Sequence, residues 1–400
     1  MEWKLKDLTV DGKGSYGIGA PAVPYQEDKL TYLRITDIND DGSLNFSDLK
    51  SVDAEDAEKY ILKENDIVFA RTGNSTGRSY FYEKQHGTFV YAGFLIKFSL
   101  DPNKVNPRIL KYYTHSKPYF DWVNSFDTGA TRGNINAKTY GDMEIELPSR
   151  KVQDKIVSIL SSLDRKIELN NKINADLEEM AQAIFKNWFV DFEPFKDGKF
   201  VDSELGMIPE GWKVGRLTEI ASYMNGLAMQ KFPPENNEDS LPVLKIKELG
   251  QGFCGTDSDR CSCNIKDECK IHNGDVIFSW SGTLLVDVWC GGDCGLNQHL
   301  FKVTSKDYPK WFYYYWTKHH LQEFIHIAKD KAVTMGHIKR GHLEEAMVAI
   351  PDNDSMEKVH ELFEPILSKM ISLRLESSRL SLLRDTLLPR LMSGELEVPE

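Results

Sequence analysis

The sequence predicts an α+β protein in which two similar globular domains are joined by two long helices that form an antiparallel coiled coil, with pseudo-two-fold symmetry. The first supporting observation is an internal duplication. Residues 133–167 and 336–371 each contain a G-x-I motif, alternating apolar positions, a proline and a long segment of periodic apolar residues. The second is that residues 150–191 and 353–392 carry apolar side chains three and four positions apart, as in a coiled-coil seam.

The duplication extends toward the start of each domain. Trp3-Lys-Leu corresponds to Trp212-Lys-Val, Leu30-Thr-Tyr-Leu-Arg-Ile to Leu241-Pro-Val-Leu-Lys-Ile, and Asn65-Asp-Ile-Val-Phe to Gly274-Asp-Val-Ile-Phe. The period is far longer than the ~20–50 residues of a solenoid repeat. The chain is therefore expected to contain one domain-plus-helix unit twice, and such a molecule suits a ligand that also has two halves.

Residues 1–149 are predicted to form the first domain and residues 212–352 the second. Runs such as 66–70 are short, β-branched or aromatic, and bounded by Gly, Asp and Asn, which is typical of strands. Helical spacing occurs over 109–123, and we expect the aromatic run 311–316 to be the equivalent core-facing helix of the second domain.

Two further segments connect or end these parts. Residues 192–211 contain two prolines and three glycines without a period, and are interpreted as the linker to the second domain. Residues 393–400 are expected to be a frayed tail.

The two helical segments, 150–191 and 353–392, are each expected to form a rod of ~60 Å, at ~1.5 Å per residue. A lone amphipathic helix of that length must bury its apolar stripe on a partner, and each segment offers the other that partner. Leu362 and Leu383 are included in the apolar period, and Pro365 predicts a kink or a helix restart near Glu364. The predicted seam contacts are Leu163, Ile167, Asn170, Asn174, Leu177 and Ile184 against Ile366, Met370, Leu373 and Leu380. Buried asparagine in such a seam costs stability and fixes register.

Composition excludes several classes of protein. The 400 residues are 41% hydrophobic and 28% charged, ordinary for a globular protein of two or three domains. No apolar run approaches ~18 residues and the N-terminus lacks a signal-peptide core, so a cytoplasmic protein without membrane partners is expected. The net charge of −12 argues against coating nucleic acid by charge alone, but permits a binder whose basic groups are focused on one face.

All six cysteines lie between Cys254 and Cys294. Their spacing differs from the paired Cys-x-x-Cys knuckles of a zinc ribbon. We therefore favour reduced thiols in a cytosolic loop region. A local zinc site remains the alternative, with ligands drawn from Cys261, Cys263, Cys269, Cys290 and Cys294.

Common catalytic motifs are missing from the sequence. No phosphate-binding G-x-x-x-x-G-K-[ST], no H-E-x-x-H and no G-x-S-x-G occurs, and the prolines do not make the Asn/Asp-Pro-Pro-aromatic motif of an amino methyltransferase. The glycine-rich run 12–20 does not have phosphate-loop order. The chain is therefore predicted to be non-catalytic and to act by recognition.

Polar loops recur at matching places in the two domains. The loop after residue 70 corresponds to the one after Ser279, and residues 128–138 correspond to 331–340. Arg, Asn, Ser and Thr side chains read base edges, and Lys holds phosphates. The alternative is that these loops only form turns, but their recurrence with different side chains favours binding to two different half-sites. The candidate DNA-binding residues are Arg71, Thr72, Asn74, Ser75, Arg78, Thr131, Arg132, Asn134 and Lys138 in the first domain, and Ser281, Thr283, Thr334, His337, Lys339 and Arg340 in the second.

The helical segments carry the most specific resemblance. LSSLDRKIELNNKINADLEEMAQAIFKNWFVDFEPF, followed by SELGMIPEGWKV, resembles the central region of specificity subunits of type I restriction–modification enzymes, and LRDTLLPRLMSGEL resembles their distal helix end. The likeness covers essentially the whole chain as target-recognition domain, central helix, second target-recognition domain and distal helix.

This resemblance implies a non-catalytic subunit that binds double-stranded DNA at two short sequences separated by an unspecified gap. It implies assembly with two modification subunits, which use S-adenosylmethionine to methylate adenine, and with ATP-driven, Mg-dependent restriction subunits, with no cofactor in this chain. Two alternatives stay open: a coiled-coil scaffold that binds no DNA, and part of a bifunctional restriction–methylation enzyme.

Overall fold

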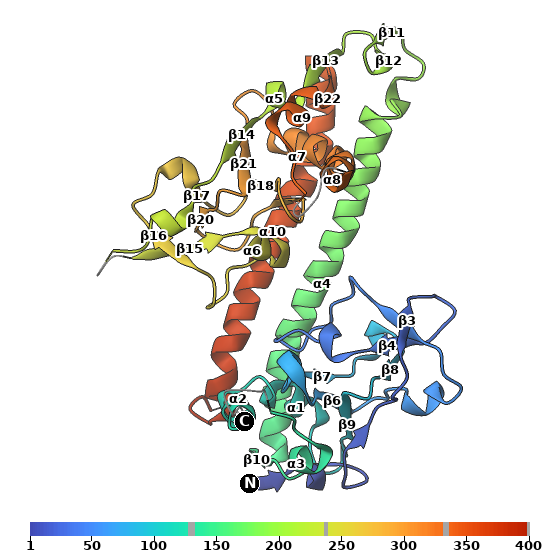
Figure 1. Ribbon diagram of the computed structural model, residues 1–400, viewed down its shortest axis with the longest axis vertical. Helices are drawn as coiled ribbons and strands as arrows, with labels where there is room; N and C mark the ends of the chain where they lie inside the picture. The colour runs from blue at the N-terminus through green and yellow to red at the C-terminus, as the bar shows by residue number, and fades with distance from the viewer. Residues whose placement is uncertain (127–132, 236–238, 331–335, 398–400) are drawn as a thin grey trace. The chain divides into compact units, whose positions relative to one another are not determined.

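The computed structural model describes residues 1–126, 133–235, 239–330 and 336–397 (Figure 1). The chain divides into two compact units, Met1–Arg165 with Ser381–Glu400, and Lys166–Leu380. Helices α4 (Arg150–Phe189) and α10 (Asn353–Met392) each supply residues to both units. In the described part of the chain, no helix is long and apolar enough to cross a membrane.

The first unit combines short strands and short helices with the beginning of α4, up to Arg165, and the end of α10, from Ser381. Its strands are β1 (Glu2–Lys4), β2 (Ser15–Tyr16), β3 (Ala22–Pro24), β4 (Thr31–Leu33), β5 (Lys50–Val52), β6 (Asp66–Ala70), β7 (Ser79–Phe81), β8 (Phe89–Tyr91), β9 (Leu95–Ser99) and β10 (Glu144–Glu146). Its helices are η1 (Leu5–Leu8), η2 (Ile35–Asp37), η3 (Ala57–Tyr60), η4 (Gly73–Ser75), η5 (Lys84–His86), α1 (Pro107–Tyr113), α2 (Lys117–Asn124) and α3 (Ala137–Gly141).

The second unit has the same mixture of elements. Its strands are β11 (Phe200–Ser203), β12 (Gly206–Pro209), β13 (Lys213–Arg216), β14 (Ser222–Asn225), β15 (Ser240–Leu244), β16 (Arg260–Ser262), β17 (Lys270–Ile271), β18 (Val276–Ser279), β19 (Leu285–Val288), β20 (Cys294–Leu296), β21 (Leu300–Thr304) and β22 (Met347–Ile350). Its helices are η6 (Glu193–Phe195), α5 (Leu217–Ile220), η7 (Met229–Lys231), α6 (Ile246–Gln251), η8 (Asp267–Cys269), α7 (Lys310–His319), α8 (Leu321–Asp330) and α9 (Arg340–Glu345).

The sheets of the two units have matching strand orders. In the described residues, the order β2-β9-β6-β7 of the first unit is matched by β14-β21-β18-β19 of the second, and β1-β10 by β13-β22. The other four-stranded sheet of each unit contains one parallel pair, β4 with β8 and β15 with β20. This agreement confirms the predicted α+β class and the internal duplication.

Gly17 of the glycine-rich run that follows η1, and Gly226 at the matching place in the second unit, have the same structural role. A Cβ on Gly17 would lie 2.2 Å from the carbonyl oxygens of Tyr91 and Ala92, and a Cβ on Gly226 would lie 2.2 Å from the carbonyl oxygen of Leu296. Strand β2 or β14 therefore passes so close to a neighbouring backbone that only glycine fits. Within the run, Gly17 therefore serves a close approach of two backbone segments.

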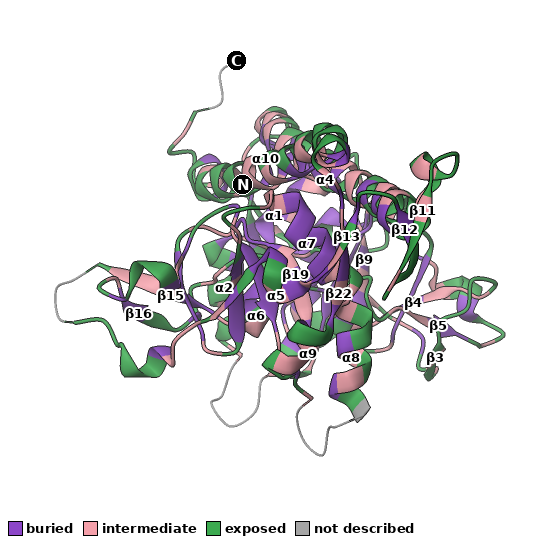
Figure 2. Ribbon diagram, turned by 90° about the horizontal axis from the view of Figure 1, so that it is seen from above, coloured by how far each residue is buried: buried purple, intermediate pink, exposed green. Residues whose placement is uncertain are grey.

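Helices α1 and α7 pack into the cores of their units. The aromatic run Trp311–Trp316 lies in α7 and is buried throughout, as predicted, and Figure 2 shows α7 almost wholly in the buried colour. The ring of Trp311 stacks on Phe363 of α10 at 4.7 Å between centroids. Such offset aromatic pairs contribute about 0.5–1.5 kcal/mol beyond their buried area, so α7 is a principal attachment of this globule to the helix pair.

Helices α4 and α10 run antiparallel in each unit. In the first unit, Asp164 pairs with Arg384, while the earlier residue Leu160 shares a core with the later residue Leu388. In the second unit, the Asn170 side chain donates to Glu376 Oε2 at 2.9 Å and to Ser377 Oγ at 3.3 Å. Further along α4, Phe185 shares a core with the earlier α10 residue Phe363. The predicted antiparallel pairing is therefore confirmed in both units.

The predicted seam is only partly in phase with the buried stripe. Asn170, Asn174, Met370 and Leu373 are buried. The remaining seam candidates are half-buried: Leu163, Ile167, Leu177, Ile184, Ile366 and Leu380. Ile184 and Ile366 pack against the core of the second unit.

Two apolar positions of α10 were wrongly expected in the seam. Leu362 and Leu383 are exposed, and the buried stripe instead passes through Phe363, Leu367 and Leu388. The reason is that Phe363 turns inward to stack on Trp311, which places its neighbour Leu362 outside. The expected helix restart near Glu364 is also wrong, because α10 continues through Pro365.

The segment 192–211 contains regular structure as well as turns. Strands β11 and β12 pair antiparallel, with Ser203 opposite Gly206, and Gly206 has a positive φ of 83° that glycine adopts readily. This hairpin lies between α4 and β13, where the sequence predicted a linker.

Two leucines of α10 test the assignment of its buried face. Leu388 is 6% exposed in the core of the first unit, and Leu382 is 69% exposed. Leu388→Ala is expected to lower the free energy of unfolding by about 2–5 kcal/mol, because it leaves a cavity in a packed core. The matched change Leu382→Ala should stay within about 0.5 kcal/mol of wild type. Urea unfolding followed by circular dichroism measures both, and equal effects would show that the buried face is misassigned.

Candidate nucleic-acid interface

The first polar loop is a compact turn at the end of β6. Arg71 and Thr72 lead into η4, and the chain returns through Gly77, whose N–H donates to the carbonyl of Ala70 at 3.0 Å. Gly73 and Gly77 have φ values of 71° and 88°, so the turn needs glycine at both places. Tyr119 Oη also donates to the Gly77 carbonyl at 2.6 Å. The loop is thus held by hydrogen bonds at both of its ends.

The second polar loop is hydrogen-bonded to the first, a contact that the sequence did not predict. The Ile135 N–H donates to the Arg71 carbonyl at 3.0 Å, and Thr76 Oγ1 donates to the Gly133 carbonyl at 3.2 Å. Ile135 is buried and anchors the segment. Of the candidate residues, Asn74, Asn134 and Lys138 are exposed, Thr72 is half-buried, and Ser75 is buried within the turn. Thr131 and Arg132 lie outside the described residues.

The two arginines of the first loop have different roles in the fold. Arg78 donates from Nε to Asp40 Oδ1 at 2.7 Å and from Nη1 to the Ile38 carbonyl at 3.0 Å. Arg71 instead lies over the ring of Tyr16, with Cζ 5.2 Å from the ring centroid. Arg78 is therefore used internally to hold the loop, whereas the guanidinium of Arg71 is stacked on an aromatic platform.

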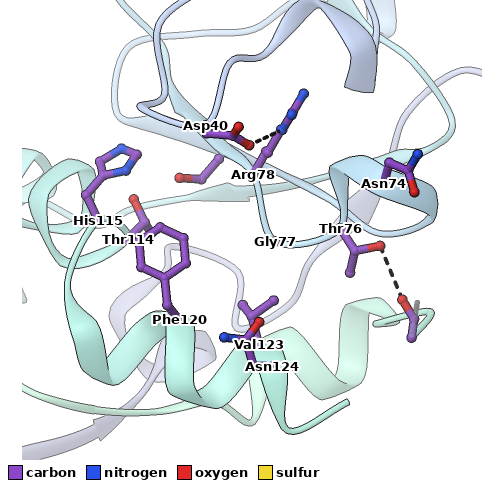
Figure 3. Close-up of a pocket in the computed structure, with 12 residues that line it drawn as sticks. Asp40, Asn74, Thr76, Gly77, Arg78, Thr114, His115, Phe120, Val123 and Asn124 are labelled. Carbon is purple, nitrogen blue, oxygen red and sulfur yellow. Dashed lines mark hydrogen bonds and ion pairs between the residues drawn. The ribbon is translucent and has the colours of Figure 1, made fainter. Parts of the chain in front are cut away.

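A cavity opens beside this loop (Figure 3), and its volume is about 220 Å³. Its walls come from the loop, from α2 and from the residues after α1, and the Asp40–Arg78 pair lies at its rim. Burial lowers the pKa of His115 in this wall to about 4, so the imidazole is neutral near pH 7. With the carboxylate of Asp40 paired to Arg78, the cavity is polar but carries little net charge.

The second unit builds the same junction with different side chains. The Ile338 N–H donates to the Trp280 carbonyl at 3.1 Å, and the Gly282 N–H donates to the Gly336 carbonyl at 2.9 Å. Gly282 has a φ of 65°, as Gly73 does in the first unit at 71°. Ser281 and His337 form an isolated antiparallel bridge here. Both predicted loop pairs are thus brought together in their own units.

The candidate residues of the second unit differ in exposure. Ser281 is buried, and its Oγ lies 3.1 Å from His299 Nδ1, so it supports the loop. The exposed candidates are Thr283, His337, Lys339 and Arg340. Thr334 lies outside the described residues.

Sequence reasoning missed the aromatic residues beside these loops. Phe94 is 57% exposed, and its carbonyl accepts from the Arg71 N–H at 3.1 Å. The corresponding His299 accepts from the Trp280 N–H at 3.4 Å. The available signal was their shared position, because Phe94 directly precedes β9 and His299 directly precedes β21.

The cysteine region was considered for a metal. Cys261, Cys269, Cys290 and Cys294 are buried as free thiols, and Cys263 is partly exposed. Throughout the ranges that the structure describes, no three His, Cys, Asp or Glu side chains form a group able to hold a metal ion. The zinc alternative thus finds no ligand set there.

Comparisons with known proteins agree with these features. A family profile described as "Type I restriction modification DNA specificity domain" matches residues 16–179 and again residues 209–373. The chain is 31% identical over 307 residues to the type I restriction enzyme MjaIX specificity subunit of Methanocaldococcus jannaschii, covering 73% of this chain and 69% of that protein. It is 22% identical over 408 residues to the HindI specificity subunit of Haemophilus influenzae, covering 84% and 88%.

A solved structure shares the fold. The S subunit of a type I restriction–modification system from M. genitalium superposes with a TM-score of 0.55 at 15% identity, covering 98% of this chain and 96% of that one. The two profile matches each contain one globular domain and run into the long helix that follows it.

Proposed function

Because the chain belongs to the specificity subunits of type I restriction–modification systems, we propose that it binds double-stranded DNA at a bipartite target, with each globular unit reading one half-site. The observation that carries the proposal is the repeated loop junction. In each unit a turn after a buried strand meets a second polar loop through equivalent backbone hydrogen bonds, from Ile135 to Arg71 and from Ile338 to Trp280.

The side chains at the two junctions support reading of different sequences. The framework is the same, but the first unit presents Arg71, Asn74, Asn134 and Lys138, whereas the second presents Thr283, His337, Lys339 and Arg340. Major-groove recognition depends on the donors, acceptors and apolar groups that face the base edges. Equivalent scaffolds with different side chains therefore suit two unlike half-sites.

The helices and the charge of the chain suggest its partners. We expect α4 and α10 to set the separation of the half-sites and to offer a surface to two modification subunits and to the restriction subunits. The net charge of −12 is unfavourable for tight binding of a polyanion by this chain alone. The modification subunits would then supply much of the positive surface, together with S-adenosylmethionine; ATP and Mg²⁺ would act on the restriction subunits.

Methyl transfer tests the proposed function. The full chain is combined with its cognate modification subunits, unmethylated genomic DNA and radiolabelled S-adenosylmethionine. Label is expected to enter adenine only when all the proteins are present. Equal labelling without this chain would contradict the proposal, labelling by this chain alone would favour the bifunctional alternative, and no change in DNA binding on adding the chain would favour the scaffold.

A further inference from the structure

The residue that directly follows the central buried strand has an equivalent place in both units. Arg71 directly follows β6 and Trp280 directly follows β18, and the backbone of each is hydrogen-bonded on both sides. The N–H groups donate to the carbonyls of Phe94 and His299, and the carbonyls accept from Ile135 and Ile338. These side chains therefore project from the same point of the duplicated scaffold.

The guanidinium of Arg71 lies on an aromatic ring and is not paired with a carboxylate of the described residues. It lies over Tyr16, whose hydroxyl accepts from the Ala137 N–H at 3.1 Å and so fixes the ring. Within the described residues, Nε of Arg71 is buried with no hydrogen-bond partner. By contrast, Arg34, Arg78 and Arg108 of the same unit all pair with carboxylates. In a chain of net charge −12, an arginine with no carboxylate partner in the described ranges is suited to an external acceptor.

Trp280 has a different environment at the equivalent point. Its ring lies 5.9 Å from those of both His299 and Phe301, and it meets His337 edge-on at 6.4 Å. Its Nε1 is also buried and has no partner among the residues that the structure describes. The partly exposed indole thus offers an apolar surface where the first unit offers a charged donor fork.

We propose that this position reads one base pair in each half-site: Arg71 specifies a guanine in the first, and Trp280 contacts the methyl group of a thymine in the second. This inference rests on the proposed function. A stacked, planar guanidinium matches the O6 and N7 acceptors of guanine, and the C5-methyl group of thymine is the apolar feature of the major groove. Tyr16 is a positioning residue for Arg71, and Phe94 and His299 flank the two readers.

A change of one atom in the guanine base tests the role of Arg71. The complex with modification subunits is bound to duplexes at fixed salt, and the first half-site carries guanine or 7-deazaguanine, which lacks the N7 acceptor. Wild type should lose roughly 5- to 150-fold in affinity, the equivalent of about 1–3 kcal/mol. Arg71→Gln should bind the guanine duplex more weakly and show little further loss with 7-deazaguanine, since the interaction is already absent.

Arg78→Gln is the matched control, because Arg78 belongs to the same loop but is paired with Asp40. It should retain the full 7-deazaguanine penalty. A penalty that persists in Arg71→Gln, or one that disappears in Arg78→Gln instead, would overturn the assignment. So would a first half-site without guanine.

The role of Trp280 is tested by replacing thymine with uracil, which removes only the methyl group. Wild type should bind the uracil duplex more weakly, and Trp280→Ala should not distinguish the two duplexes. An equal uracil penalty in both proteins would overturn the role of Trp280. Failure of the proposed function would look different, because the wild-type complex would then show no preference for any bipartite duplex.

Discussion

Asp164→Asn is expected to destabilise the first unit by about 3–5 kcal/mol, because it removes one partner from a buried network of charges. The Asp164 side chain is only 10% exposed. Its Oδ2 accepts from Tyr112 Oη at 2.9 Å and lies 3.1 Å from Lys111 Nζ, while its Oδ1 accepts from Arg384 Nη1 at 3.1 Å. The network joins α1, α4 and α10, so its loss affects how the first globule is held.

Hydrogen exchange measures this effect locally, because a chain of two units need not unfold in one step. The amides of α1 should exchange faster in Asp164→Asn than in wild type. Asp176→Asn is the matched control on the same helix, since Asp176 is exposed, and it should exchange as wild type does. Unchanged protection of α1 in Asp164→Asn would show that the network does not stabilise the attachment.

The same carboxylate predicts a dependence of stability on pH. Burial alone would raise the pKa of Asp164, but Lys111 and Arg384 hold it below its ordinary value. A lowered folded-state pKa means that the stabilisation is complete above the unfolded value near 4 and is lost as the pH falls through the folded value. The stability difference between wild type and Asp164→Asn should therefore shrink as the pH falls below about 4.

Lengthening both long helices by four residues is expected to change the gap between the half-sites and leave the half-sites themselves unchanged. The insertions belong near Asn170 in α4 and opposite it in α10, near Ser377, because these residues are hydrogen-bonded. Four residues add ~6 Å and about 40° beyond one full turn. DNA advances ~3.4 Å per base pair and turns once in about 10–10.5 base pairs. The gap should thus grow by one or two base pairs.

The matched control inserts four residues in α4 alone. It should reduce methylation at all sites, because the asparagine seam is then out of register with α10. Sequencing of methylated adenines measures both variants. Altered half-sites with an unchanged gap would contradict the assignment of spacing to the helices.

The sequence predicted the duplication and the helices well, because both depend on repeated local patterns. The recurring G-x-I motifs indicated the duplication, and the structure shows that Ile135 and Ile338 are both buried. The phase of α10 was harder to predict. Both Leu362 and Phe363 fit an apolar stripe, and only the stacking of Phe363 on Trp311, a residue distant in sequence, decides which of them is buried.

The candidate site could be predicted as loops but not as individual side chains. The sequence does not distinguish the roles of Arg71 and Arg78, because both are arginines of the same polar loop. Only the fold places Asp40 beside Arg78 and Tyr16 beside Arg71. Trp280 lies within the loop predicted for the second domain but was not named as a site residue, and His299, which directly precedes β21, was not considered. Contacts with residues distant in the sequence decide which side chains hold the loops and which can face a ligand. No local sequence pattern encodes these contacts.

The central claim, that two units read two half-sites across a fixed gap, is tested most directly by mapping methylated adenines. The wild-type chain and its cognate modification subunits are produced in a host without adenine methylation, and the genome is sequenced for the modified base. The expected result is two short specified sequences separated by a constant gap without base preference. A single uninterrupted motif, or methylation without sequence preference, would contradict the claim.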